Sequence, residues 1–154
     1  MFKKFYNSYL AYVLVYTFYF LSFALFSSLI SVYMLGLGFS AGQTSVVVSV
    51  AFFASMLAQP VMGILNDRLS IKKVTLFSFG AIIFIAIYFM QVRDLLGLTI
   101  GYSLVVMLMN GVNPVMDVLA ARSPYTYGKI RIWGTIGYAL GSQLAGVLYQ
   151  YVSP

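Results

Sequence analysis

The sequence predicts an all-α integral membrane protein, a helical bundle of about five transmembrane helices. Of its 154 residues, 62% are apolar and only 8% are charged, whereas soluble domains carry roughly 25% charged residues. Thirteen Tyr and thirteen Phe exceed what one small core can bury, but they suit a chain whose solvent is lipid. Long uncharged runs recur along the chain, and a bilayer-spanning helix needs about 20 such residues. Lipid is therefore the expected environment.

The first two spans are bounded by recognisable stop signals. The first covers about 9–35 and is roughly twice as long as the apolar core of a signal peptide, so we expect it to be retained. Gly38 interrupts the apolar run, and Ser40 can cap the next helix. The second span, about 41–65, ends at the polar and charged segment 66–73.

Three further spans follow, each delimited by polar or charged residues. The third, about 74–90, ends at the segment 91–94, which carries two charges. The fourth, about 95–121, ends at the basic segment 122–131, and the fifth covers about 132–152. All five are expected in a single transmembrane domain that takes up residues 1–154.

The cations predict the orientation of the chain. By the positive-inside rule, the loops richest in Lys and Arg face the cytoplasm. Arg93 alone falls on the opposite side, so we expect a multi-pass protein of the cell membrane with a cytoplasmic N-terminus. Cations clustered between apolar runs also argue against a nucleic-acid partner. The eight on the cytoplasmic side are Lys3, Lys4, Arg68, Lys72, Lys73, Arg122, Lys129 and Arg131.

The composition disfavours enzymatic chemistry. Cys and His are absent, which excludes disulfides, thiol nucleophiles, imidazole bases and the usual zinc sites. With only three acids, a Ser or Tyr nucleophile lacks a convincing base. We expect no catalytic residue, cofactor or metal, and the short loops offer no soluble domain for a receptor or assembly module.

One face of the fourth span is polar. Asn110, Asn113, Pro114 and Asp117 fall within about a 100° arc of the helix. An ionised Asp inside a membrane helix costs about 3 kcal/mol, so Asp117 needs a partner or an aqueous cavity. Pro114 removes one backbone hydrogen bond, and Asn110 or Asn113 could serve the freed carbonyl.

The fifth span repeats this division into faces. Arg131 and Tyr138 share a polar face. The presence of Arg131 near Asp117 has two interpretations. The two form an ion pair that holds the spans together, or they hydrogen-bond a polar solute; both hold if the pair opens when solute arrives. An adjoining stripe of small residues permits close helix packing: Gly134, Gly137 and Gly141.

Aromatic residues share one face of the first span. This face is either the wall of a solute cavity or a surface for lipid and helix packing. Tyr16 and Tyr19 lie too deep for the headgroup belt, which favours the cavity for these two. The residues of this face are Tyr9, Tyr12, Tyr16, Tyr19, Phe23 and Ser27.

The segment from Gly63 to Lys73, GILNDRLSIKK, resembles the signature loop between spans two and three of the major facilitator superfamily. Ser70 and Ile71 stand where that family usually has Gly and Arg. The resemblance implies a cytoplasmic latch that contributes to gating, formed by Gly63, Asp67, Arg68, Lys72 and Lys73.

Two further segments, NPVMD at 113–117 and YGKIRIWGTIGY at 127–138, resemble the lactose-permease branch of that superfamily. The resemblance implies that Asp117 is an acidic sugar ligand, that Arg131 contacts the sugar and that Tyr138 stacks on its ring. Asp and Tyr replace the Glu and Trp of the branch, so galactoside specificity is not implied.

The resemblance implies a secondary active transporter that moves a small polar solute, such as a sugar or nucleoside, by proton-coupled alternating access. Its partners would be the bilayer, the solute, protons and a missing C-terminal half, because family members have twelve spans in two halves. The alternatives are a small homo-oligomeric, proton-coupled multidrug exporter and a non-functional truncated fragment. The implied solute ligands are Asp117, Arg131, Tyr138, Asn110, Asn113, Tyr16 and Tyr19.

Overall fold

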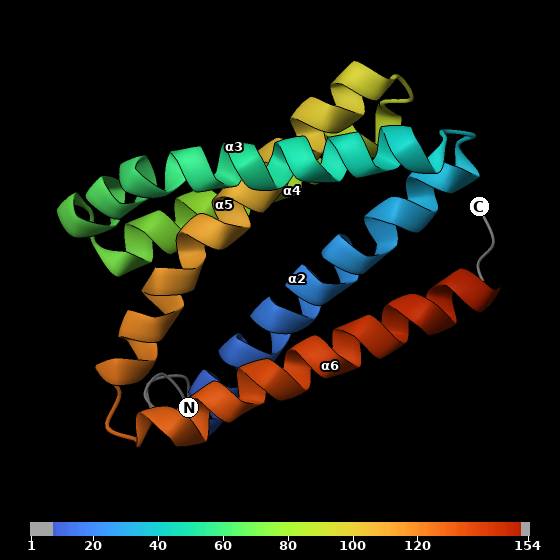
Figure 1. Ribbon diagram of the computed structural model, residues 1–154. Helices are drawn as coiled ribbons and strands as arrows, with labels where there is room; N and C mark the ends of the chain where they lie inside the picture. The colour runs from blue at the N-terminus through green and yellow to red at the C-terminus, as the bar shows by residue number, and fades with distance from the viewer. Residues whose placement is uncertain (1–7, 152–154) are drawn as a thin grey trace. The chain divides into compact units, whose positions relative to one another are not determined.

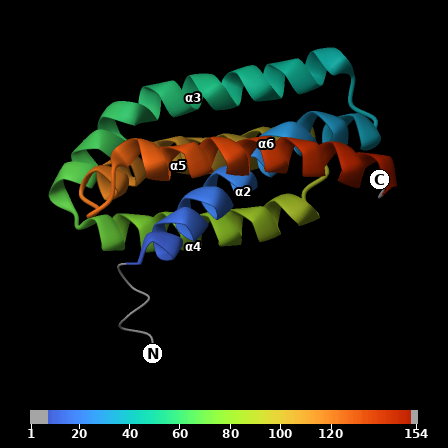
Figure 2. The same ribbon diagram turned by 90° about the horizontal axis from the view of Figure 1, so that it is seen from below.

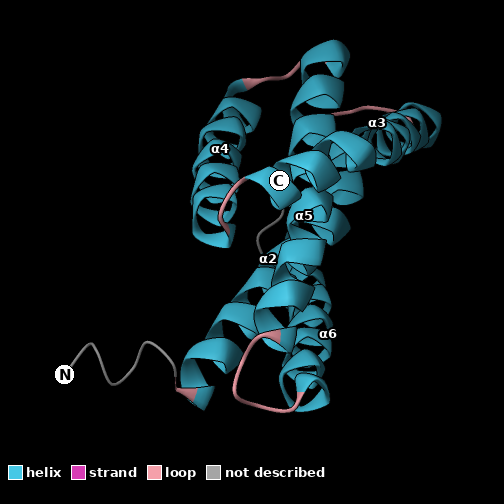
Figure 3. Cartoon of the chain, turned by 90° about the vertical axis from the view of Figure 1, so that its left-hand side faces the viewer, coloured by secondary structure: helices cyan, strands magenta, loops and turns pink. Residues whose placement is uncertain are grey.

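The computed structural model describes residues 8–151, apart from the side chain of Ile71, and these residues form α-helices joined by short loops (Figure 3). The predicted all-α class is confirmed. Lys3, Lys4 and Val152, which contributed to the predicted orientation and to the fifth span, lie outside the described residues. The helices are α2 (Tyr9–Gly36), α3 (Ala41–Arg68), α4 (Ile71–Gln91), α5 (Leu95–Ala121) and α6 (Tyr127–Tyr151).

Two of the expected breaks between helices are shorter in the structure. The segment 66–73 is mostly helical, because α3 continues through Arg68 and α4 begins at Ile71. Helix α6 begins at Tyr127, so Arg131 lies on the helix and not in the preceding loop. Charged side chains mark where apolar surface ends, but a helix can continue past that point with its charges exposed. The charge pattern therefore predicted the end of α3 too early in the sequence, and the starts of α4 and α6 too late.

Local hydrogen bonds explain where α3 and α5 begin. The Ser40 hydroxyl accepts from the Gln43 backbone N–H at 3.2 Å, and the Gln43 side chain accepts from the Ser40 N–H at 2.9 Å. The predicted Ser40 cap is thus confirmed. Gly38, with φ 90°, makes the turn before it in a conformation that favours glycine. Asp94 caps α5 by accepting from the Gly97 N–H at 2.7 Å.

Among the described residues, four helices are long and apolar enough to cross a membrane: α2, α3, α4 and α5. Helix α6 has 25 residues, which is long enough. It is less apolar than the other four because Lys129, Arg131, Gln143 and other polar residues are spread along it. The fifth crossing therefore stays a prediction.

The chain divides into two compact units. One contains α2, the end of α5 from Met116 onward, and α6; the other covers residues 37–115 and so contains α3, α4 and most of α5. In the first unit, α2 and α6 lie side by side and run in the same direction (Figure 1). Successive spans cross a membrane in alternating directions, so the first and fifth spans are expected to run in the same direction.

Glycines on α6 form the contact with α2. A Cβ added at Gly137 would lie 2.3 Å from the backbone oxygen of Thr17, and one added at Gly141 would lie 2.5 Å from that of Leu21. At Gly134 the added Cβ would meet the Phe20 ring at 2.7 Å. Only residues without a Cβ allow two helix backbones to approach this closely. The predicted small-residue stripe is therefore the face that α6 presents to α2.

In the second unit, α3 and α4 run in opposite directions (Figure 2). Helix α5 approaches α3 at Gly111, where an added Cβ would lie 2.3 Å from Cε of Met62. It approaches the end of α4 at Gly101, where an added Cβ would lie 3.2 Å from the ring of Phe89. Both contacts place a bulky side chain in the space that a glycine leaves open.

We predict that Gly137→Ala destabilises the fold, because the new methyl group collides with the α2 backbone, which cannot move aside as a side chain would. Overpacking of this kind costs about 1–3 kcal/mol. The midpoint of thermal unfolding in detergent should fall by several degrees. Gly146→Ala on the same helix is the control, because its Cβ meets nothing within 4 Å; equal midpoints for the two variants would contradict the packing described here.

Candidate functional site

An ion pair joins the end of α5 to the start of α6. The Arg131 Nε atom lies 3.5 Å from Oδ1 of Asp117, and the Tyr127 hydroxyl donates to the same oxygen at 3.0 Å. The side chains of Arg131 and Asp117 keep 40% and 48% of their surface accessible. The acid therefore has both a charged and a neutral partner while remaining open to an approaching molecule.

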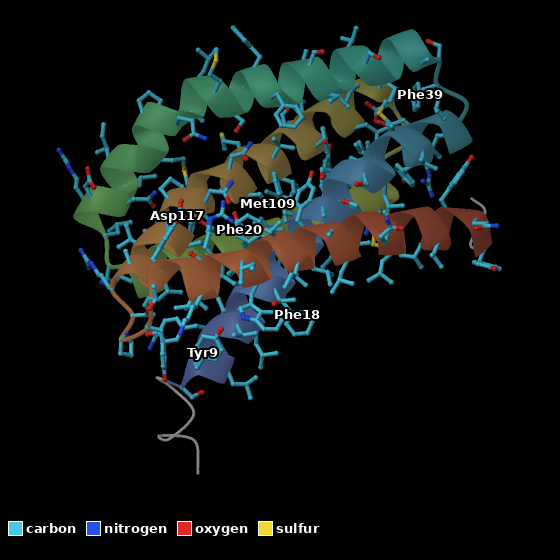
Figure 4. All side chains as sticks on the ribbon, turned by 60° about the horizontal axis from the view of Figure 1, so that its bottom comes forward. Tyr9, Phe18, Phe20, Phe39, Met109 and Asp117 are labelled. Carbon is cyan, nitrogen blue, oxygen red and sulfur yellow. The ribbon has the colours of Figure 1, made fainter. Side chains whose placement is uncertain are left out.

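The Arg131 side chain is also supported from α2. Its guanidinium carbon lies 4.9 Å from the centroid of the Phe20 ring, a distance at which the ring face attracts a cation. Figure 4 labels Phe20 on α2 and Asp117 on α5. Arg131 is thus held by an aromatic ring and a carboxylate, which fixes the direction of its planar donors.

Tyr16 and Tyr19, expected to stack on a solute, are both buried, at 0% and 3% exposure. The Tyr16 hydroxyl donates to the Met116 carbonyl on α5. Both rings contact Phe20, at centroid distances of 5.9 and 5.0 Å. Their ring faces are covered in this conformation, so Tyr16 serves here to hold α2 against the end of α5.

Tyr138 is more accessible than the tyrosines of α2. It is 42% exposed, and its ring lies 6.3 Å from that of Phe23 on α2. The two rings are tilted by 56° to one another, and part of the Tyr138 side chain remains accessible. It lies on α6 about two turns beyond Arg131, which is on the same helix face.

The sequence did not reveal the role of an aromatic cluster around Tyr9. The Trp133 indole N–H donates to the Tyr9 hydroxyl at 2.9 Å, and that hydroxyl donates to the Lys129 carbonyl at 3.0 Å. Tyr125, in the loop before α6, packs edge-on against Tyr9 and Tyr12 at 5.2 and 6.0 Å. These residues fasten the start of α6 to α2. For this part of the α2 face the helix-packing interpretation is therefore supported, not the cavity wall.

The predicted amide ligands Asn110 and Asn113 lie on α5 in the second unit. The Asn110 amide donates to the Ser55 hydroxyl on α3 at 2.9 Å, and Asn113 donates to Asn110 at 3.5 Å. Both side chains are partly accessible, as is that of Asp117, whereas Val105 and Val112 elsewhere on the helix are fully buried. The three polar side chains of α5 are thus more accessible than these two valines.

A backbone carbonyl near Pro114 is served by a residue that was not anticipated. Asn66 on α3 donates from its side-chain amide to the Gly111 carbonyl at 3.1 Å. The carbonyl that Pro114 frees is that of Asn110, four residues before it, so the expectation that Asn110 or Asn113 serves it stays a prediction. A contact across 45 residues arises only from helix packing, so sequence periodicity had no means to show it.

The residues expected to form a cytoplasmic latch lie on helix ends. Gly63, Asp67 and Arg68 belong to the last turns of α3, while Lys72 and Lys73 belong to the first turn of α4. All five are exposed. The segment that is expected to act as a latch therefore consists of two helix ends and the two residues between them. Within the described residues, no cluster of three or more acidic residues is placed to hold a metal ion.

Helices that are long and apolar enough to cross a membrane define a multi-pass membrane protein. A family model described as the LacY proton/sugar symporter matches residues 2–154, and the chain belongs to that family. The predicted resemblance to the lactose-permease branch of the major facilitator superfamily is thereby confirmed.

Three curated relatives are permeases of sugars. The chain is 28% identical to the lactose permease of Citrobacter freundii over 122 residues, which cover 71% of this chain and 29% of the relative. It is 29% identical to the sucrose permease of Escherichia coli over 162 residues, covering 96% of the chain and 39% of the relative. The raffinose permease of Escherichia coli is 29% identical over 125 residues, covering 73% and 29%.

The chain thus spans between 29% and 39% of the length of these relatives. No solved structure matches it significantly.

We predict that Tyr9→Phe loosens the start of α6, because the variant loses both the acceptor for the Trp133 indole and the donor to the Lys129 carbonyl. Trp133 is the only tryptophan of the chain, so quenching of its fluorescence by acrylamide in detergent reports directly on this cluster. The quenching constant should rise. Tyr151→Phe, at a position 78% exposed, is the matched control, and an unchanged constant for Tyr9→Phe would show that the cluster does not anchor α6.

Proposed function

We propose that this chain forms part of a proton-coupled sugar transporter that works by alternating access. The observation that carries the proposal is the half-exposed pair of Asp117 and Arg131 in a chain of the LacY proton/sugar symporter family. The relatives named above are permeases for lactose, sucrose and raffinose. An oligosaccharide is therefore the proposed solute class.

The chemistry of the pair suits a sugar. A hydroxyl group both donates and accepts, a carboxylate offers two acceptor oxygens, and a guanidinium offers a planar set of donors. The contacts of Asp117 with Arg131 and Tyr127 both use Oδ1, and the ion pair uses Nε of Arg131. In the proposed complex, Oδ2 of Asp117 and the terminal nitrogens of Arg131 bind adjacent sugar hydroxyls. Tyr138 would supply an apolar ring face to the sugar.

The same pair provides a gate. A partly exposed ion pair contributes only about 0.2–1 kcal/mol, so sugar hydroxyls can replace it at small cost. Before sugar enters, Asp117 and Arg131 satisfy each other; once it binds, each turns to the solute. Stacking by Tyr16 and Tyr19 stays a prediction, because it requires a conformation in which α2 exposes their rings.

The surroundings of the site are also proposals. We place the N-terminus in the cytoplasm and the protein in the cell membrane, because the cations of the α3–α4 and α5–α6 connections lie on one side in a five-span topology. The latch of Gly63, Asp67, Arg68, Lys72 and Lys73 would then face the cytoplasm. A second helical bundle, corresponding to the remaining length of the relatives, would be the partner that encloses the sugar.

We predict that Asp117→Asn and Arg131→Gln each lower uptake of a labelled disaccharide by about tenfold or more, since each loses a hydrogen bond to a charged group. Uptake should be measured in cells that express the intact gene product, with surface expression quantified. Two controls should retain activity: Arg122→Gln, which is exposed, and Asp94→Asn, since Asn caps a helix as well as Asp does. Wild-type uptake and affinity in both test variants would remove the pair from the site.

We also predict that a protonophore prevents accumulation of the labelled sugar above its external concentration. Equilibration across the membrane should continue, because the sugar site itself does not depend on the gradient. Replacing external Na⁺ with K⁺ is the control for sodium coupling. Accumulation that persists with the protonophore but is lost without Na⁺ would show that transport is coupled to Na⁺ and not to protons.

A further inference from the structure

Tyr127 makes the shorter of the two contacts with the Asp117 carboxylate. Its hydroxyl donates to Oδ1 at 3.0 Å, within the range of O–H···O hydrogen bonds, whereas Nε of Arg131 lies 3.5 Å from the same oxygen. A hydrogen bond from a guanidinium to a carboxylate is about 2.7–2.9 Å long, so this ion pair is loose. The neutral phenol, and not the cation, therefore makes the firmer bond to this acid.

The two donors come from one face of α6. Tyr127 and Arg131 are four residues apart on this helix, so their side chains lie one turn apart on the same side. The guanidinium also lies 4.9 Å from the centroid of the Phe20 ring on α2, which attracts it. Arg131 therefore has a second contact that can hold it when it separates from Asp117.

The loop between α5 and α6 brings Tyr127 back to the end of α5, although Tyr127 follows Asp117 by ten residues. The Ser123 hydroxyl donates to the Ala120 carbonyl at 2.7 Å and accepts from the Tyr125 N–H at 3.2 Å. These bonds close the turn between the two helices. All of these residues belong to the same compact unit, so the contact of Tyr127 with Asp117 depends only on this short connection.

We propose that Tyr127 is a positioning residue of the sugar site: its hydroxyl holds the Asp117 carboxylate in place when the solute draws Arg131 away. The proposal rests on the sugar-transport function proposed above. A partly exposed ion pair is weak, so sugar hydroxyls can separate Arg131 from Asp117. Tyr127 stays on Oδ1, so that the acid keeps a donor and Oδ2 keeps its direction toward the sugar. Tyr127 acts through Asp117 and does not touch the solute.

Chemical labelling of Asp117 tests this inference without any sugar. The intact gene product in detergent is treated with a carbodiimide and an amine, and the labelled acids are located by mass spectrometry. Asp117 should be labelled about threefold faster in Tyr127→Phe, because Oδ1 has lost its nearer donor. Tyr149→Phe, at a position 53% exposed on the same helix, is the matched control. Asp94 should be labelled at the same rate in every variant, which shows that the fold is retained.

A second pair of variants tests whether Tyr127 still holds the acid after the cation has left. Arg131→Met removes every donor of Arg131 at similar length, and so imitates the open ion pair. Adding Tyr127→Phe to Arg131→Met should speed the labelling of Asp117 about fivefold further. Equal rates in Arg131→Met and the double variant, or an unchanged rate in Tyr127→Phe alone, would overturn the proposal.

The second readout is uptake of the labelled disaccharide. In Tyr127→Phe the concentration for half-maximal uptake should rise about fivefold, while the maximal rate stays within about twofold of wild type. A general loss of structure would lower the maximal rate as well. If the affinity falls without faster labelling of Asp117, Tyr127 binds the solute itself and does not position the acid. If the wild type neither binds nor transports sugar while the labelling rates are as expected, it is the proposed function that fails.

Discussion

In the first unit, the α6 backbone approaches the α2 backbone closely along Gly137 and Gly141. Without a Cβ at these positions the two helices meet at distances that no other residue allows. This approach brings Arg131 over the Phe20 ring and Trp133 to the Tyr9 hydroxyl. The ion pair of Arg131 with Asp117, and with it the candidate sugar site, depends on this approach because Arg131 lies on α6.

The polar side chains of the chain have two roles: some remain accessible to a solute, and others hydrogen-bond neighbouring helices together. Asp117 and Arg131 remain about half exposed even though they pair with each other, which leaves them accessible to a solute. Asn66, Asn110 and Ser55 instead join α3 to α5 beside a proline that removes a backbone hydrogen bond. Membrane helices have little hydrophobic attraction for one another, so such bonds and close small-residue contacts decide how they pack. The proposed sugar site and the contacts between helices thus use the same few residue types.

Sequence reasoning succeeded where the signal is local and periodic. The helices, the Ser40 cap and the small-residue face of α6 follow from apolar runs, one serine and a glycine spacing, and each involves residues a few positions apart. It was less successful where a residue type has several possible partners. Tyr9, Tyr12, Tyr16 and Tyr19 share a face as expected, yet Tyr16 hydrogen-bonds a carbonyl of α5 and Tyr9 anchors α6. An aromatic stripe indicates a face but does not say what covers it.

The sequence by itself determined the all-helical membrane class, the family and the candidate pairing of Asp117 with Arg131, because composition, apolar run length and motif order are properties of the chain alone. Only the tertiary structure decided that Phe20 supports Arg131, that Tyr127 donates to Asp117 and that Asn66 reaches Gly111. Two of these contacts join helices that are far apart in sequence, and their geometry follows from how closely two backbones approach. Helical periodicity assigns each residue to a face, but it carries no information on which face of another helix it will meet.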